Sequence, residues 1–176
     1  AIYGLLRVSL DLLQARLWWW GVVLLGIGLA TAIFGVVFAA VQSDMKRLLA
    51  YSSIENIGFI VAGIGLALLF SAYGMAALAA LALAAAVYHV AAHAFFKSLL
   101  FLGTGAVLHA TRERSLGRLG GLIRVMPWVA WLSLAGTLAS AGLPPFGGFV
   151  SGRLLLQSFL FTPGLPSGFL NMLIPV

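Results

Sequence analysis

Leu17 to Val41 reads LWWWGVVLLGIGLATAIFGVVFAAV, a run of 25 residues without a charged side chain. About 20 consecutive apolar residues are enough for a helix to cross a bilayer. The run opens on Trp18, Trp19 and Trp20, and tryptophans gather at the headgroup level of membranes. This stretch therefore predicts a transmembrane helix that starts at a membrane–water interface.

The composition of the chain excludes a soluble globular fold. Of 176 residues, 62% are hydrophobic and 8% are charged, whereas soluble domains carry about 25% charged residues. A net charge of +6 is compatible with nucleic-acid binding, but no polar segment is present to carry a basic patch. The excess of Lys and Arg in cytoplasmic loops explains the charge better, so no nucleic-acid partner is expected. The chain has no Cys, which excludes disulfides and Cys-held metal centres.

Further apolar stretches predict an all-α fold, a polytopic bundle of transmembrane helices with one Pro/Gly-broken helix. We expect one membrane domain, residues 1–176, that is a fragment of a longer subunit. The chain begins and ends within apolar segments, and it does not begin with an initiator Met. The expected spans are 1–13 in part, 17–41, 48–70, 75–110, 125–161 with a break, and 169–176 in part.

The segment 75–110 is long for a single span. A helix of this length would measure about 54 Å, against a hydrocarbon core of about 30 Å, so we expect it to tilt and project or to bend near Gly103 and Gly105. A single pass is favoured because it puts the turn at 42–47 and the loop at 111–124 on one side. These segments hold six Lys and Arg, which predicts that this side is cytoplasmic.

The apolar segment 125–161 contains Pro144, Pro145, Gly147 and Gly148 near its middle. Proline removes a backbone donor and clashes with the preceding turn, so a break is expected there. Backbone groups freed at membrane depth must be satisfied by protein or by water. The broken helix is therefore expected to line a cavity.

His89, His93 and Lys97 stand at i, i+4 and i+8, which places them along one stripe of the long helix. Ionisable groups at membrane depth cost several kcal/mol unless they are paired or hydrated. A neutral imidazole accepts a proton on one nitrogen and releases one from the other. The stripe predicts a proton relay formed by His89, His93 and Lys97. The structural alternative is that the histidines are hydrogen-bonded packing residues and that the lysine snorkels to an interface.

Two further charged residues fall within apolar segments. Glu55 lies about two turns inside its span, where it can act as a relay carboxylate or as a counter-ion that modulates Lys97. The alternative is that Glu55 pairs with Lys46 or Arg47 at the interface. Arg153 follows the break and cannot be neutralised, so it is expected to be an electrostatic element on the broken helix.

The sequence predicts no catalytic, metal or cofactor site of its own. A haem held by His89 and His93 is disfavoured because residues four apart on one helix point the same way, whereas two axial ligands approach the iron from opposite faces. His109 is interpreted as an interface residue at the end of its helix. Phosphate-loop, nucleophile-elbow and metalloprotease motifs do not occur.

Three strings resemble the antiporter-like membrane subunits of respiratory complex I and its relatives, in the order of that family. The strings are QSDMKRLLAYSSIENIG at 42–58, HVAAHAFFKSLLFL at 89–102 and GLPPFGGF at 142–149. The pair Glu55–Asn56 and the string Leu108 to Thr111 look most like the hydrogenase-4 component B and formate hydrogenlyase branch.

The resemblance implies a proton-translocating unit in the inner membrane of a bacterium, within a larger complex whose other membrane and peripheral subunits hold the redox centres. It makes His89, His93 and Lys97 the central hydrated relay and gives the broken helix after Leu143 the exit side. Family members are much longer, so this window corresponds to part of one half-channel and the central axis.

One position departs from the family pattern. After Phe149-Val150-Ser151 the family usually has a Glu or Lys, but this chain has Gly152 followed by Arg153. Either Arg153 takes over the electrostatic role or the terminal relay step differs. Two other functions remain open at this stage: a Na⁺/H⁺ or K⁺/H⁺ antiporter subunit without redox partners, and a structural anchor for a soluble oxidoreductase arm.

Overall fold

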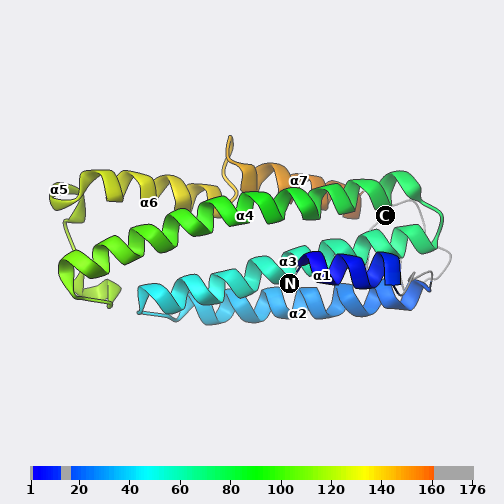
Figure 1. Cartoon of the computed structure of the whole chain (residues 1–176), viewed down its shortest axis with the longest axis horizontal. Helices are drawn as coiled ribbons and strands as arrows, with labels where there is room; N and C mark the ends of the chain where they lie inside the picture. Colours follow the sequence, from blue (N-terminus) through cyan, green and yellow to red (C-terminus); the bar gives the residue numbers. More distant parts are fainter. Residues whose placement is uncertain (1, 13–16, 161–176) are drawn as a thin grey trace.

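A computed structural model describes residues 2–12 and 17–160, and Figure 1 shows its helices lying lengthwise beside one another. The described residues are helical apart from turns and one isolated β-bridge, which confirms the all-α fold class. The elements in chain order are α1 (Ile2–Leu6), a π-helix (Arg7–Leu12), α2 (Trp18–Ala40), α3 (Met45–Ala72), α4 (Ala76–Thr111), a 3₁₀ helix (Leu116–Arg118), α5 (Leu122–Val125), α6 (Pro127–Ser140) and α7 (Gly147–Leu160).

Helices α2, α3 and α4 are each long and apolar enough to cross a membrane. Residues 76–111 form one uninterrupted helix, so the chain does not bend near Gly103 or Gly105 into two elements. The expected partial span 169–176 lies outside the described residues.

Helix α3 begins three residues before the span expected from hydropathy. The Asp44 carboxylate accepts from the N–H of Lys46 at 2.8 Å and from that of Arg47 at 3.1 Å, which caps the first turn. The N–H of Arg47 lowers the pKa of this carboxyl below its usual value. Lys46 and Arg47 therefore stand in the first turn of a helix, rather than in a loop.

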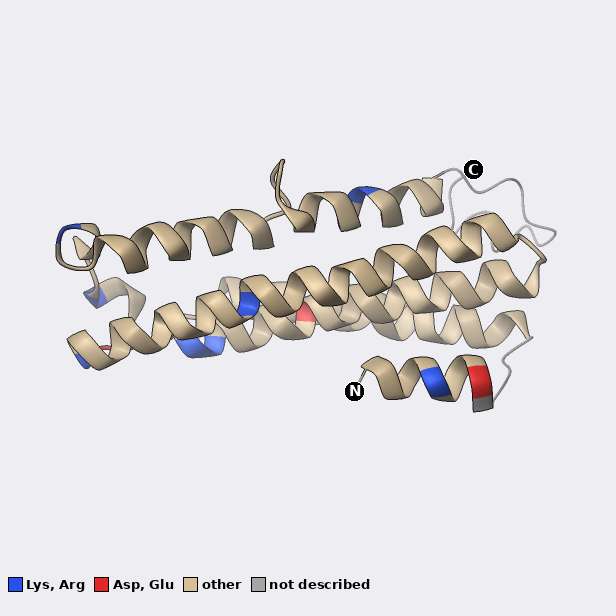
Figure 2. Ribbon diagram, turned by 45° about the horizontal axis from the view of Figure 1, so that its top comes forward, with Lys and Arg blue, Asp and Glu red and all other residues tan. Residues whose placement is uncertain are grey.

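The start of α3 and the end of α4 lie at the same end of the bundle. Met45 N–H donates to the Arg114 carbonyl at 3.2 Å, and Leu116 N–H donates to the Ser43 carbonyl at 2.9 Å. Figure 2 shows several of the Lys and Arg segments at this end of the helices. The two basic segments are thus on one side, as a single pass of α4 requires.

Glycines bring α2 and α3 into direct backbone contact. Gly21, Gly28 and Gly35 recur every seven residues along α2, and all three are buried. A Cβ on Gly21 would lie 2.7 Å from the Leu69 nitrogen, and one on Gly28 would run into Ala62. Small residues at such a contact let helices approach closely in a membrane. The contact fixes the rotation of α3 about its own axis and so determines which of its residues face α4.

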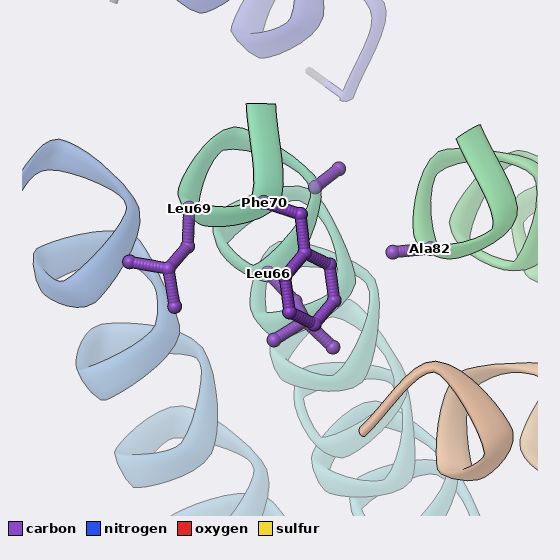
Figure 3. Packing of buried hydrophobic residues seen from close by; sticks show 5 residues of the cluster. Leu66, Leu69, Phe70 and Ala82 are labelled. Atoms are coloured by element: carbon purple, nitrogen blue, oxygen red, sulfur yellow. The ribbon is translucent and has the colours of Figure 1, made fainter. Parts of the chain in front are cut away.

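A cluster of fully buried apolar side chains lies where α3 meets α4. Leu66, Leu69, Phe70 and Ala82 are nearly inaccessible to solvent and belong to one cluster. In Figure 3 the Phe70 ring and the Ala82 methyl lie between α3 and α4, and the Leu69 side chain lies on the α2 side. These buried apolar side chains, near the end of α3 and the start of α4, anchor α4 on α3. They thereby hold the polar residues in the middle of both helices in register.

Helices α6 and α7 lie end to end along α4, and residues 141–146 separate them (Figure 1). The break has a direct cause, since prolines at 144 and 145 cannot donate to the carbonyls of Ser140 and Ala141. Gly142, with a φ of 68°, ends α6 in the left-handed region that glycine adopts easily. Gly147 and Gly148, which the sequence suggested as part of the break, form the first turn of α7 instead.

We predict opposite effects on stability for alanine at two glycines of α2. Gly28→Ala should lower the free energy of unfolding by about 1–3 kcal/mol, because the new methyl forces α2 and α3 apart. Gly26→Ala is the matched control: nothing lies within 4 Å of its Cβ position, so better helix propensity should raise stability by about 0.5–1 kcal/mol. Chemical unfolding of the full-length subunit in detergent measures both, and equal effects would contradict the close α2–α3 contact.

Candidate functional site

Lys97 is directed from α4 onto α3 at the middle of the bundle. The residue is 5% exposed, although it carries an ammonium group. Its Nζ donates to the Ser52 hydroxyl at 2.7 Å and makes a longer contact of 3.5 Å with the Leu49 carbonyl. The side chain therefore does not snorkel to an interface. A buried amine with two oxygen partners can hold a proton and can also release it.

His89 lies two turns before Lys97 on α4 and is held through both ring nitrogens. Its Nε2 lies 3.0 Å from Asn56 Oδ1, and its Nδ1 lies 2.8 Å from Ser151 Oγ. Asn56 Nδ2 donates to the Ser52 carbonyl at 2.7 Å, which leaves Oδ1 as the acceptor that faces the ring. The imidazole thus connects α3, α4 and α7.

His93 occupies the position between these two groups but does not join them by hydrogen bonds. Its ring centroid lies 6.3 Å from that of His89, and its ring meets Phe96 edge-on at 5.4 Å. Its Nε2 is buried and has no hydrogen-bond partner among the described residues. A buried polar atom of this kind is usually satisfied by water, so this nitrogen marks a place where water can bind.

The polar edge of α3 directly connects two buried basic side chains of α4, His89 and Lys97. Ser52 binds Lys97 through its hydroxyl and Asn56 through its carbonyl, and Asn56 binds His89. Sequence reasoning gave no role to Ser52 or Ser151 and used Asn56 only for the family resemblance. The available signal was the i, i+4 spacing of Ser52 and Asn56 in an otherwise apolar helix.

Glu55 lies near Lys97 and His89, but among the described residues no hydrogen bond or ion pair joins it to either. It is half-buried and within electrostatic range of Lys97. Among the described residues, no ion pair joins it to Lys46 or Arg47. Glu55 lines a cavity of about 330 Å³ together with His89 and residues of the helix break. The cavity has room for several waters.

The cavity lies among α2, α3, α4 and the broken pair α6 and α7. Three residues of α2 line it, and Gly148 and Gly152 of α7 line it as well. The full lining is Ala32, Ile33, Val36, Glu55, Asn56, Phe59, His89, Ser140, Ala141, Gly142, Gly148 and Gly152. The break thus brings unwound backbone next to the only carboxylate of α3.

Arg153 and His109 lie apart from this cluster. Arg153 is exposed on α7, two residues beyond the buried Ser151. His109 is exposed near the end of α4, where it lines a second cavity of about 450 Å³ with Lys46, Arg112 and Arg114. The structure therefore brings together His89, His93, Lys97 and Glu55, and it leaves Arg153 outside.

Comparison with known proteins identifies the relatives of this chain. A family model described as "NADH:quinone oxidoreductase/Mrp antiporter, TM" matches residues 1–163. A Mycobacterium tuberculosis protein described as uncharacterized is 47% identical over 159 residues, 90% of this chain and 25% of the relative. Formate hydrogenlyase subunit 3 of Escherichia coli is 42% identical over 158 residues, 90% of this chain and 26% of the relative.

Hydrogenase-4 component B of Escherichia coli is a third relative, 40% identical over 159 residues. The alignment covers 89% of this chain and 24% of that protein. The chain thus spans about a quarter of the length of the curated relatives it matches.

Two adjacent serines of α3 allow a paired test of the Lys97 geometry. Ser52→Ala removes the shorter of the two Lys97 contacts and should lower the free energy of unfolding by about 1–3 kcal/mol. Ser53→Ala is the control, because the Ser53 hydroxyl donates to the Leu49 carbonyl of its own helix at 2.9 Å. Its removal should be nearly neutral. Unfolding of the full-length subunit measures both, and equal losses would show that Ser52 does not hold Lys97.

Proposed function

Because this chain belongs to the NADH:quinone oxidoreductase/Mrp antiporter membrane family, we propose that it conducts protons as part of a longer antiporter-like subunit. The resemblance read from the three sequence strings is confirmed by that membership. The chain, residues 1–176, would form one membrane domain of that subunit. The complex would be related to NADH:quinone oxidoreductase or to a membrane-bound hydrogenase or formate hydrogenlyase.

The observation that supports this proposal most is the burial of Lys97. An amine at membrane depth costs several kcal/mol unless its surroundings compensate. Here Ser52 compensates with a hydrogen bond, Glu55 lies within electrostatic range, and His89 lies two turns away. A purely structural contact could be made at lower cost by an apolar residue. The polar cluster is therefore better explained by proton transport.

Each residue of the cluster has a proposed role. Lys97 would be the switchable central proton site, and His93 and His89 would be its shuttles. Glu55 would modulate Lys97, because gain or loss of a nearby negative charge changes how firmly an ammonium holds its proton. Water at Nε2 of His93, which has no partner among the described residues, would extend the path from Lys97 toward His89.

The proposed setting is the bacterial inner membrane, in a complex with other membrane subunits and with peripheral subunits that carry the redox cofactors. The end of the bundle with Lys46, Arg47 and the loop arginines would face the cytoplasm, because loops on that side carry the excess of basic residues. The chain would contribute no cofactor, no metal and no nucleic-acid contact of its own.

Lys97→Met should abolish most proton translocation per electron in the full-length complex. Methionine keeps a similar length and volume but cannot hold a proton, so assembly and electron transfer should persist while pumping is lost. The measurement is acidification by proteoliposomes during redox turnover. Lys46→Met, at the exposed start of α3, is the matched control and should leave pumping unchanged. Normal pumping in a correctly assembled Lys97→Met complex would refute the proposal.

Arg153 is proposed as an electrostatic element on the exit side of the broken helix. It stands next to Gly152, where the family usually has a charged residue, but its side chain is exposed. Arg153→Gln should therefore reduce the pumping rate partially, and Arg153→Lys should retain it, because only the positive charge is required. Equal rates for wild type and Arg153→Gln would remove Arg153 from the pathway.

A cation/proton antiporter of the multisubunit kind is the second candidate. The matching family model covers NADH:quinone oxidoreductases and Mrp antiporters together, so the described residues serve either function. The two functions differ in their driving force. Na⁺- or K⁺-driven proton movement in a purified complex that lacks any dehydrogenase or hydrogenase partner would favour the antiporter.

A further inference from the structure

We propose that Ser151 of α7 is the proton-exchange partner of His89, so that His89 takes up and releases its mobile proton at Nδ1, toward the broken helix. This inference rests on the proposed function, in which His89 carries protons. It adds a residue and a route: the proton is exchanged between α4 and α7 at Ser151.

Asn56 determines which ring nitrogen of His89 already carries hydrogen. The amide nitrogen of Asn56 donates to the Ser52 carbonyl, so the amide oxygen faces His89. An amide oxygen only accepts hydrogen bonds, and the ring must therefore donate to it from Nε2. Asn56 thus fixes neutral His89 as the Nε2–H tautomer. An amide side chain does not shuttle protons, so Asn56 orients the ring without conducting.

Nδ1 is the nitrogen of His89 that remains able to bind a proton. In the Nε2–H tautomer only Nδ1 has a free lone pair, and Nδ1 lies 2.8 Å from Ser151 Oγ. No hydrogen bond joins His89 to His93 or Lys97 among the described residues. An incoming proton therefore has one nitrogen to bind, and that nitrogen is covered by Ser151, which is fully buried.

The Ser151 hydroxyl has one hydrogen and three acceptors within hydrogen-bond distance. Besides His89 Nδ1, the carbonyls of Gly148 at 3.1 Å and Gly147 at 3.2 Å lie within hydrogen-bond distance of Oγ. When the ring is neutral, the hydroxyl donates to Nδ1. When the ring is cationic, Nδ1–H donates to Oγ and the hydroxyl turns to a carbonyl. Both charge states of His89 are satisfied without movement of any heavy atom.

The proton transfer to His89 breaks and forms equal numbers of bonds. The Ser151 hydrogen passes from Oγ to Nδ1, and Oγ accepts a replacement proton from a hydronium ion on the side of the break. The hydronium becomes water, the imidazole becomes an imidazolium, and the serine stays neutral. Gly148 and Gly152, on either side of Ser151 along α7, line the cavity that would hold this water. Ser151 itself is fully buried and does not line the cavity, so the hydronium reaches Oγ when α7 opens locally.

Other charged groups near His89 act on its charge but do not replace Ser151. His93 and Lys97 share α4 with it, and Glu55 faces the same cavity from α3. Arg153 is the charged residue of α7 and is exposed, and the cavity residues of α2 are apolar. None of these groups is hydrogen-bonded to a His89 nitrogen in the described part of the chain.

The first test is the pH dependence of proton translocation by the full-length complex. Ser151→Ala should slow translocation and move the midpoint of its pH profile to lower pH, because a buried imidazolium would lose the acceptor of its Nδ1–H. Ser151→Thr keeps the hydroxyl and should retain the wild-type midpoint. Ser158→Ala is the matched control: it removes an equally buried hydroxyl from the same helix, seven residues further on.

The second test reads the ring directly in the unmodified protein. Nitrogen-15 NMR of histidine-labelled full-length subunit in liposomes, with His89→Gln used to assign the signal, reports which nitrogen carries hydrogen. The neutral ring should be the Nε2–H tautomer. Asn56→Leu should convert part of it to the Nδ1–H form, because the acceptor that fixes the tautomer is gone.

Two results would overturn the inference and leave the proposed function intact. One is a neutral His89 with hydrogen on Nδ1. The other is a Ser151→Ala profile that matches Ser158→Ala while His89→Gln abolishes translocation. If His89→Gln itself left translocation and its pH profile unchanged, the place of His89 in the proposed function would fail, and the Ser151 inference with it.

Discussion

The backbone contact between α2 and α3 is the constraint on which the arrangement of the site depends. At Gly21, Gly28 and Gly35 no side chain separates the backbones of the two helices, so α3 cannot rotate about its axis without a clash. Gly35 lies against the backbone of Glu55 itself. The rotation of α3 determines that Ser52 and Asn56 face α4, and these two residues in turn hold Lys97 and His89.

The polar groups in the middle of the bundle follow from a second constraint, the lack of water in the surrounding hydrocarbon. Each must find a partner inside the protein or in a hydrated cavity. His89 and Lys97 find theirs on neighbouring helices, whereas one nitrogen of His93 has none among the described residues. The cluster combines two fixed members with one incompletely satisfied member between them. This combination suits proton transfer better than a fully satisfied network, which would be rigid.

Hydropathy and residue spacing were sufficient to predict the fold class and the stripe of His89, His93 and Lys97, because both depend on local periodicity. The interpretation of Arg153 as the charge of the broken helix depended on a single position, and the structure places that side chain at the surface. The partners Ser52, Asn56 and Ser151 could not be found in this way. Their role depends on how three helices rotate against one another, and the glycine contacts that set this rotation have no signature of their own in a hydropathy pattern.

The break between α6 and α7 has a further consequence for the cavity beside His89. Each half-helix has a dipole, with partial negative charge at its carboxyl end and partial positive charge at its amino end. Ser140, Ala141 and Gly142 bring the carbonyl end of α6 to the cavity, and Gly148 brings the amide end of α7 to it. The backbone therefore creates an electric gradient across this space, with its negative side at the end of α6. This field arises because two prolines interrupt the helix and leave two helix ends at the cavity. It does not depend on a charged side chain at position 152, which is glycine.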